Sequence, residues 1–502
     1  MKYLFWCIAS VSLILSGCPT NTSRAEVLTQ ETAAQSSVPL AERLPADPSS
    51  PGWVLTSSLD DGFGVPFIAT DVSDNIYTTG WYSPPVEQSR DGIYKNPGCY
   101  VGKLDPDGND LWTLVWTPET TEDNIYTRCI AVGSSGDIFV AGIFEGSIDF
   151  DPTSAQDIRT VAQKSGFFLS CFSPDGKYLW TRCWGGGARG VQSVSGMAFD
   201  DRGDLYIAGV FFGNVDFDPG PSEDKHNAWG GAYLLKLDGD GQYIWARTWG
   251  DENGSAETDA FAIGPDGDIC VAGTFRGTVD LDPSETALQV SSDTAHKIYL
   301  SKFTPDGALA WARVWGGEDP SHPFCAAFDV QGDIYAVGWV GGSIDFDPGP
   351  GTDLQGTPGG PEQSFMTKYD RDGAYQWTRT WGGTQMCYAQ RLVMEPAGRV
   401  LVLGRFDGSA DFDPDPSNER AASSANSKIF LSEFGTDGSF LSVTTFGGAG
   451  GQGAEVIVLD HSGHILLAGE FTDSLDLRPF LDCIVRNASG TRAGFLCKVD
   501  RE

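Results

Sequence analysis

The sequence is poor in positive charge and lacks helical periodicity, and each shortage excludes a class of protein. The 502 residues carry 33 Lys and Arg against 68 Asp and Glu, a formal net charge of −35. Such a surface repels nucleic-acid phosphates and anionic lipid, so we expect no nucleic-acid partner. No stretch has apolar residues at helical spacing over any length, which argues against a helical fold.

Familiar catalytic and metal-binding motifs are also missing. There is no C-x-x-C pair, so neither a zinc knuckle nor a thioredoxin-like site is indicated. There is no G-x-S-x-G or H-E-x-x-H, so neither a hydrolase elbow nor a zinc-protease helix is supported. The five histidines are scattered, apart from His461 and His464, which share one turn and could ligate a metal. The sequence therefore indicates no catalytic residues and no required cofactor, and it favours a protein that is not an enzyme.

The N-terminus has the features of an export signal followed by a tether. Residues 1–17 hold Lys2 and a short apolar run, Leu4 to Leu15, which is too short to span a bilayer. The run ends in Leu-Ser-Gly before Cys18, which resembles the lipobox of bacterial lipoproteins, and the resemblance implies that Cys18 carries lipid. Pro19 rather than Asp follows, which by the same resemblance favours the outer over the inner membrane of the cell envelope. Residues 18–51 are rich in Ser, Thr, Ala and Pro and are expected to be a disordered tether.

The rest of the chain, residues 52–502, is a repeat. Seven copies of an alternating apolar run end in a glycine, and these glycines lie 62 to 67 residues apart: Gly80, Gly142, Gly209, Gly273, Gly338, Gly404 and Gly469. Each copy contains four short strand patterns, A to D, separated by Gly, Asp and Pro turns. Four antiparallel strands in seven copies predict an all-β, seven-bladed β-propeller.

The two ends of the repeat region complement each other. The last copy stops after its third strand, near Asp500, whereas a strand-D pattern beginning at Trp53 precedes the first copy. We therefore expect this N-terminal strand to complete the last blade and to close the ring, which would remove exposed sheet edges.

Strand D carries Trp-x-x-x-Trp in five copies, and four of these have Arg between the two tryptophans. Residues two apart lie on one face of a strand, so indole and guanidinium groups form a stripe. A stripe could stack on carbohydrate, but its repetition in most blades favours packing between blades. Trp81, Trp229 and Trp339 fall outside this pattern and are better candidates for an exposed contact.

A D-F-D-P step follows strand B and is the main candidate for a cation site. Both aspartates of an extended D-x-D segment point the same way, and calcium prefers such carboxylates. The calcium candidates are Asp149 and Asp151, Asp216 and Asp218, Asp280 and Asp282, Asp345 and Asp347, and Asp411 and Asp413. Two alternatives stay open, namely ion pairs with the strand-D arginines, and turn capping without a cation.

Nine cysteines remain after Cys7 and Cys18 are set aside, and their odd number leaves at least one unpaired if all disulfides are internal. We interpret them chiefly as buried free thiols that pack as small apolar groups.

The motifs G-D/N-I-Y-x-A-G, the aspartate–phenylalanine step, F/Y-L-x-K-L/F-D-x-D-G and W-x-R-x-W-G-G together resemble bacterial SBBP propeller repeats. The resemblance implies exported or surface-attached proteins and no established activity. Because the B–C and D–A loops are long and variable, we expect binding on the face that they share. The sequence thus favours a monomeric, lipid-anchored, non-catalytic binding or scaffold protein whose protein or glycan ligand is unidentified. The alternative is a glycan hydrolase or lyase with a site at the central channel, where the unlike first copy, Trp81 to Gly92, is the place to look.

Overall fold

The structure is a computed structural model. It describes residues 52–499 except 59–63, 65–66, 83–97, 119, 121, 154, 162–164, 186–189, 285–286, 318, 479–484 and 489–491. The predicted signal segment, Cys18 and the tether lie outside the described residues, as does most of the segment Trp81 to Gly92. All regular structure in the described part is β, and no helix there is long and apolar enough to cross a membrane.

Most strands belong to antiparallel sheets of four or five strands, which follow one another along the chain. One sheet holds β2 (Phe67–Thr70), β3 (Ile76–Tyr82), β4 (Gly98–Leu104) and β5 (Asp110–Trp116), and another holds β6 (Asn124–Val132), β7 (Ile138–Glu145), β10 (Gly166–Phe172) and β11 (Tyr178–Trp184). The next two hold β12 (Gly190–Phe199), β13 (Leu205–Asp216), β14 (Lys225–Leu237) and β15 (Tyr243–Trp249), and then β16 (Gly254–Ala256), β17 (Ala260–Ile263), β18 (Ile269–Asp280), β19 (Gln289–Phe303) and β20 (Leu309–Trp315).

An eight-stranded sheet joins two further sets of four strands. The first set is β21 (Ser321–Phe328), β22 (Ile334–Val340), β25 (Gln363–Tyr369) and β26 (Tyr375–Gly383), and the second is β27 (Cys387–Met394), β28 (Arg399–Asp411), β29 (Ala421–Gly435) and β30 (Phe440–Phe446). They merge because the end of β26 pairs with the end of β28 through Gly382 and Gly383.

The remaining four-stranded sheet brings the two ends of the described chain together. It contains β1 (Trp53–Ser58), β35 (Ala493–Val499), β32 (Ile465–Phe471) and β31 (Gln452–Leu459). β1 pairs antiparallel with β35 over its whole length, from Trp53 opposite Lys498 to Ser58 opposite Ala493. The predicted pairing of an N-terminal strand with the last repeat is therefore present.

Three strand pairs lie where the predicted B–C loops run. They are β8 (Ser147–Asp149) with β9 (Ile158–Thr160), β23 (Gly342–Asp345) with β24 (Leu354–Thr357), and β33 (Ser474–Asp476) with β34 (Val485–Asn487). These pairs shorten the part of each loop that lacks regular structure.

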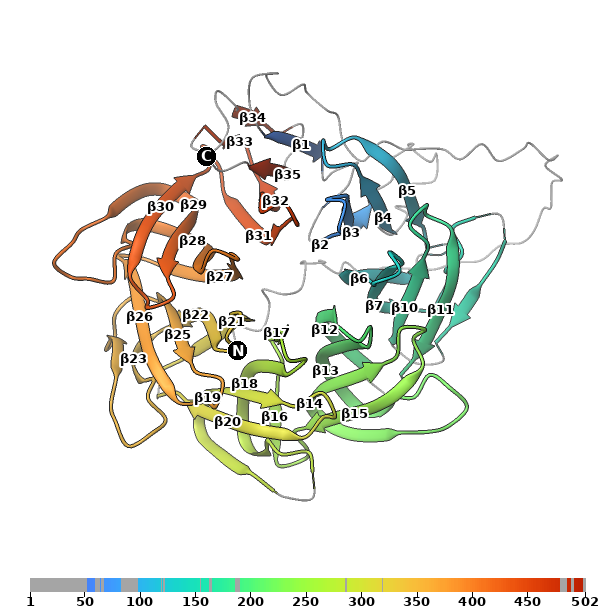
Figure 1. The fold of residues 1–502 in the computed structure, drawn as a ribbon, viewed down its shortest axis with the longest axis horizontal. Helices are drawn as coiled ribbons and strands as arrows, with labels where there is room; N and C mark the ends of the chain where they lie inside the picture. The colour runs from blue at the N-terminus through green and yellow to red at the C-terminus, as the bar shows by residue number, and fades with distance from the viewer. Residues whose placement is uncertain are drawn as a thin grey trace, which may run out of the picture. The chain divides into compact units, whose positions relative to one another are not determined.

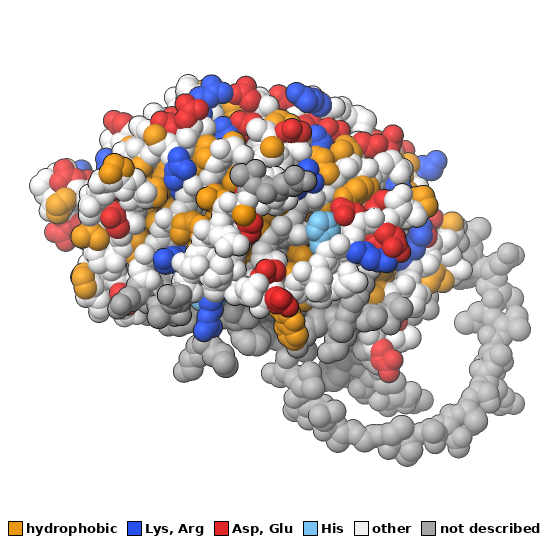
Figure 2. All heavy atoms as spheres, turned by 90° about the horizontal axis from the view of Figure 1, so that it is seen from below, with side chains coloured by type: hydrophobic (Ala, Val, Ile, Leu, Met, Phe, Trp, Pro, Cys, Tyr) orange, Lys and Arg blue, Asp and Glu red, His pale blue; other side chains and the backbone are white. Residues whose placement is uncertain are grey.

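The sheets are arranged around a common centre, as in a β-propeller, with β2, β6, β12, β17, β21, β27 and β31 innermost (Figure 1). The core lies between neighbouring sheets: Phe139 on β7 and Phe199 on β12, for example, have ring centroids 4.9 Å apart. The side of the molecule drawn in Figure 2 mixes acidic with basic side chains, without a continuous basic patch among its described residues.

The strand-D tryptophans join one sheet to the next, as the packing interpretation predicted. The second tryptophan of each pair is buried, from 2% exposed at Trp116 to 8% at Trp184. The first lies against a turn of the following repeat: a Cβ placed on Gly307, whose φ is +80°, would stand 3.0 Å from the ring of Trp245. Trp53 repeats this contact with Gly108, so β1 packs as a strand D.

The innermost strands are irregular, and one of these irregularities forms the candidate site. In several sheets the register shifts by one residue beside the glycine of the second strand, leaving one residue bulged. Bulges redirect side chains and recur near functional sites. In the sheet of β18 the innermost strand is interrupted instead, and Glu257, Thr258 and Asp259 lie between β16 and β17.

Candidate metal centre

The interruption between β16 and β17 brings two carboxyl groups to a histidine of the next sheet. Glu257 and Asp259 come from the interruption, and His322 from the start of β21. Their potential ligand atoms all lie within 4.8 Å of one another. Among the described residues, this is the group of three or more Asp, Glu, His or Cys side chains placed to hold one metal ion.

The imidazole of His322 is oriented toward the carboxyl groups. Its Nδ1 lies 2.8 Å from the carbonyl oxygen of Pro323, which fixes Nδ1 as the donor of that hydrogen bond. Nε2 lies 3.5 Å from Oδ2 of Asp259. This oxygen is buried and has no hydrogen-bond partner among the described residues. Unless a proton or a cation lies between them, two acceptors face each other there.

Burial makes the carboxylate form unfavourable at both acidic residues. It raises the pKa of Asp259, an effect that the nearby His322 partly offsets. Burial also raises the pKa of Glu257, and the charge of Asp259 adds to the rise. His296 on β19 belongs to the same surroundings: burial lowers its pKa, and the charge of Glu257 opposes that effect. A bound cation would relieve this repulsion.

The donor set fits a divalent transition metal better than calcium. Zinc binds carboxylate oxygen and imidazole nitrogen, and open zinc sites commonly use three protein ligands. A histidine that ligates metal usually donates its other ring nitrogen to a carbonyl or carboxylate, as Nδ1 of His322 does with Pro323. Three ligands would leave coordination positions for a bound molecule.

A second charged group lies on β31 and β32. Burial raises the pKa of Glu455, and Arg391, Arg492 and Arg405 oppose the rise. Burial and the charge of Glu455 raise the pKa of Glu470 to about 7, although Arg492 forms an ion pair with Glu470. Near-neutral carboxyl groups are suited to proton transfer.

The D-F-D-P aspartates act as acceptors for loop N–H groups. Oδ1 of Asp216 accepts hydrogen bonds from the N–H of Asp218 at 3.2 Å and of Asp224 at 2.9 Å, and Asp218 accepts one from Gly220 at 2.7 Å. The same pattern recurs at Asp149, Asp280, Asp345 and Asp411. The structure thus supports turn capping, and calcium at these pairs stays a prediction.

The alternative that the strand-D arginines pair with these aspartates is wrong. Each arginine donates instead to a backbone carbonyl in a turn of the following repeat: Arg182 to Asp240, Arg247 to Gly307, Arg313 to Gly373 and Arg379 to Gly438. The guanidinium groups also lie over the first tryptophan of their own strand, with Arg182 4.8 Å from the Trp180 centroid. The arginines therefore strengthen the contact between repeats.

The structure also bears on the other residues singled out in the sequence, namely the tryptophans outside the strand-D pattern, the histidine pair and the cysteines. Trp229 is 65% exposed, whereas Trp339 is only 6% exposed and so was a poor candidate for an exposed contact. His464 binds Asp460 through Nδ1, at 2.8 Å, rather than joining His461 in a metal site. The eight described cysteines are free thiols, and six of them are buried, which confirms that interpretation. Cys483 lies outside the described residues.

No motif in the sequence singles out Glu257 and Asp259, and His322 stands there as one of several scattered histidines. A signal was present, because Glu257 and Asp259 are the two charged residues of the segment 254–263, which is otherwise apolar or uncharged. The proximity of these two acids to His322 could not be predicted from the sequence, because it depends on how neighbouring sheets pack.

The sheets and the repeats define an all-β protein of the β-propeller, WD-repeat-like class. No family model matches the chain. An uncharacterized WD repeat-containing protein of Acanthamoeba polyphaga mimivirus is 23% identical over 304 residues, and the match covers 49% of this chain but only 22% of the viral protein.

Several solved structures show distant likenesses. A polysaccharide lyase that acts as an ulvan lyase is 11% identical, with 82% of this chain and 93% of that chain covered and a TM-score of 0.40. A gluconolactonase from Xanthomonas campestris is 15% identical, with coverages of 74% and 95% and a TM-score of 0.30. A protein of unknown function from Bacteroides caccae is 10% identical, with coverages of 69% and 89% and a TM-score of 0.32. Likenesses at these TM-scores carry no argument about what this chain binds or does.

Proposed function

We propose that the chain is a non-catalytic binding protein that holds a divalent metal ion at Glu257, Asp259 and His322 and takes its ligand on the face of the long loops. The observation that carries the proposal is the orientation of His322, whose Nε2 faces the buried Oδ2 of Asp259 while Nδ1 is held by a carbonyl. A three-ligand metal ion leaves positions for donor atoms of a ligand. His322 is the second residue of β21, directly after a D–A loop, and so lies near that face.

The proposal includes a closed ring of seven blades, with β1 as the last strand of the seventh. The pairing of β1 with β35 and the contact of Trp53 with Gly108 support it. A further contact joins the first and last repeats, since the carboxylate of Asp74 accepts hydrogen bonds from Ser462. The motifs described above are the basis for assigning the repeats to the SBBP type.

The cellular setting is part of the same proposal. The lipobox-like residues before Cys18 support an exported protein anchored by lipid in the cell envelope, on the outer membrane, and we take the propeller to be monomeric. Fractionation of cells that express wild-type protein or Cys18→Ser tests the anchor. Wild type should pellet with membranes and the variant should not; equal pelleting would contradict lipid attachment.

Thermal unfolding of the purified protein with EDTA or with added Zn²⁺, Mn²⁺ or Ca²⁺ tests the metal. An ion at 100 times its Kd adds about 2.7 kcal/mol to the stability of the folded protein. We expect one of the transition metals to raise the melting temperature of wild type but not of Glu257→Gln or His322→Ala. His461→Ala is the control, because His461 is exposed and in another repeat. A shift that persists in both site variants would refute the site.

A glycan-processing enzyme is the second candidate, and the pKa of about 7 at Glu470 favours it. A carboxyl group of this kind can act as a general acid or base near neutral pH. Polysaccharides incubated with the protein would then yield new reducing ends or unsaturated products, and Glu470→Gln would abolish them. Failure to produce either from a broad panel would leave the binding function as the account.

A further inference from the structure

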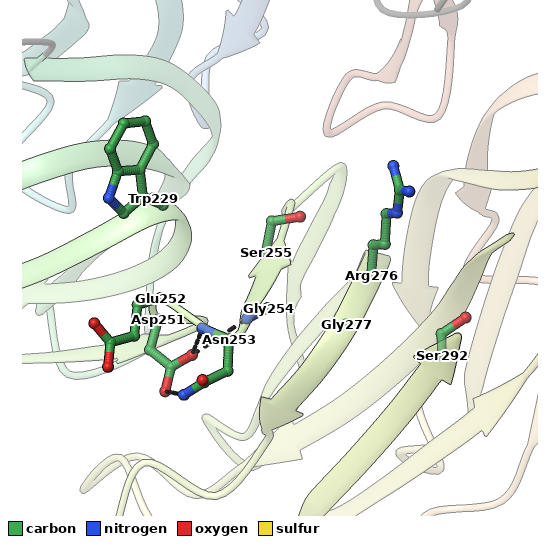
Figure 3. A pocket seen from close by; sticks show the side chains of 9 residues that line it. All are labelled: Trp229, Asp251, Glu252, Asn253, Gly254, Ser255, Arg276, Gly277 and Ser292. Carbon is green, nitrogen blue, oxygen red and sulfur yellow. Dashed lines mark hydrogen bonds between the residues drawn. The ribbon is translucent and has the colours of Figure 1, made fainter. Parts of the chain in front are cut away.

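A hollow of about 420 Å³ lies between β14 of one sheet and β16, β18 and β19 of the next. Trp229 stands on one side and Arg276 and Ser292 on the other, with the segment Asp251–Ser255 between them (Figure 3). The hollow is widely open to solvent and has a mostly polar lining, so it could hold one unit of a longer chain rather than enclose a whole ligand. The strands are in contact beside it, since a Cβ on Gly230 would stand 3.3 Å from Cβ of Ser255.

The chain places Trp229 at the hollow by a local departure from regular pairing. Phe211 faces Gly231 and Gly213 faces Ala228, so Trp229 and Gly230 together oppose one residue, in a β-bulge. Gly230 has a φ of +123°, which favours glycine. A bulge redirects side chains, and here it accompanies an indole that is 65% exposed. The strand-D tryptophan of the same sheet, Trp249, is only 3% exposed.

Polar residues form the floor of the hollow, and hydrogen bonds between them fix their positions. The carboxylate of Asp251 accepts hydrogen bonds from the backbone N–H of Asn253 at 2.6 Å and from its side-chain Nδ2 at 3.1 Å (Figure 3). These bonds orient the amide of Asn253. The guanidinium of Arg276, which is exposed, and the hydroxyl of Ser292, which is buried, complete a lining that offers both donors and acceptors.

We propose that this hollow binds a hexose unit of an oligosaccharide, with the pyranose ring stacked on Trp229. An exposed aromatic face matches the C–H face of a sugar ring, while placed amide, carboxylate and guanidinium groups match its hydroxyls. Asp251 and Glu252 line the same hollow as Arg276, so the lining has no excess of positive charge, which favours a neutral sugar over a sulfated or uronic one.

The inference deepens the proposed function and rests on it for the choice of face. The hollow lies close to the candidate metal centre, because Ser255, which lines the hollow, precedes Glu257 by two residues. The stacking site itself uses none of the proposed metal ligands. Sugar binding and metal binding can therefore be separated by experiment.

Calorimetric titration of the purified full-length protein with neutral hexose oligomers tests the inference: cello-, malto-, laminari- and mannohexaose, each with and without EDTA. We expect at least one of them to bind, and Trp229→Ala to weaken that binding at least tenfold. Trp229→Phe should retain most of the affinity. Leu354→Ala is the matched control, because Leu354 is 64% exposed on another repeat. Melting curves establish that each variant is folded.

Each possible result separates this site from the metal centre. Binding that persists in EDTA but falls in Trp229→Ala supports the hollow even if no metal binds anywhere. A proline-rich peptide is titrated as a second probe. The inference is overturned if none of the hexaoses binds or if folded Trp229→Ala binds them as wild type does. It is also overturned if Trp229→Ala weakens only the binding of the peptide.

Discussion

Removal of β1 should destabilise the whole propeller. β1 buries Trp53, Val54 and Leu55, which are 7%, 2% and 6% exposed. Loss of a buried tryptophan costs about 3–5 kcal/mol, and each buried Val or Leu contributes roughly 1.5–3 kcal/mol. The sum is on the order of 6–11 kcal/mol, which is comparable with the total stability of about 5–15 kcal/mol of a typical domain. The edge of β35 would also be left unpaired and open to aggregation.

Urea unfolding and size-exclusion chromatography should compare proteins that begin at residue 52 and at residue 59. The shorter protein should unfold at much lower urea or form aggregates. Trp53→Ala in the longer protein should lose about 3–5 kcal/mol, whereas Trp229→Ala, at an exposed indole, should change stability by no more than about 0.5 kcal/mol. If the protein that begins at residue 59 stays monomeric and unfolds at the same urea concentration, the role assigned to β1 is refuted.

Further predictions concern turns, acceptors and pH. Gly307→Ala should cost more stability than Gly463→Ala in urea unfolding, because both have positive φ but only Gly307 lies against a tryptophan; equal losses would contradict the contact. Asp216→Ala, measured in EDTA, should cost about 1–3 kcal/mol by leaving two N–H groups without their acceptor. Asp216→Asn should cost less under the same conditions. A calcium site predicts instead that both variants lose similar stability when Ca²⁺ is present, and that chelation lowers the melting temperature of wild type. The folded-state pKa of Glu470 is raised to about 7, so the folded protein holds its proton more tightly than the unfolded chain. This contribution to stability is complete below the unfolded pKa of about 4.3 and is lost as pH rises through 7. Glu470→Gln should flatten that decline in melting curves between pH 4.5 and 7.5; an unchanged decline would contradict the assignment.

The repeat, the strand order and the packing role of the tryptophans could be predicted because each rests on a local pattern. The glycines used to align the copies, from Gly80 to Gly469, all lie in the second strand of their repeat. Repetition also indicated that the tryptophan stripe packs one blade against the next, because a feature that recurs in most blades is expected to have a structural role. The partners of the strand-D arginines could not be predicted, because the sequence shows their charge but not their distances. In the structure each of them donates to a turn carbonyl of the next repeat.

The candidate site escaped prediction for a different reason. Glu257 and His322 belong to neighbouring repeats and meet only because one innermost strand is interrupted and the next begins beside it. An interruption or a bulge changes where a side chain points without changing the hydrophobic period that predicts the strand. Trp229 was identified as a candidate because it breaks the repeat, but the bulge that accompanies its exposure could be found only in the structure.

Anomalous diffraction from crystals soaked in Zn²⁺ or Mn²⁺ tests the central claim most directly. The account predicts an anomalous peak bonded to a carboxylate oxygen of Glu257, Oδ2 of Asp259 and Nε2 of His322, at about 2.0–2.2 Å from each. The peak should disappear in His322→Ala crystals. Density without a peak at this group, while Nε2 of His322 donates directly to Asp259, would show an ordinary ion pair and contradict the metal centre.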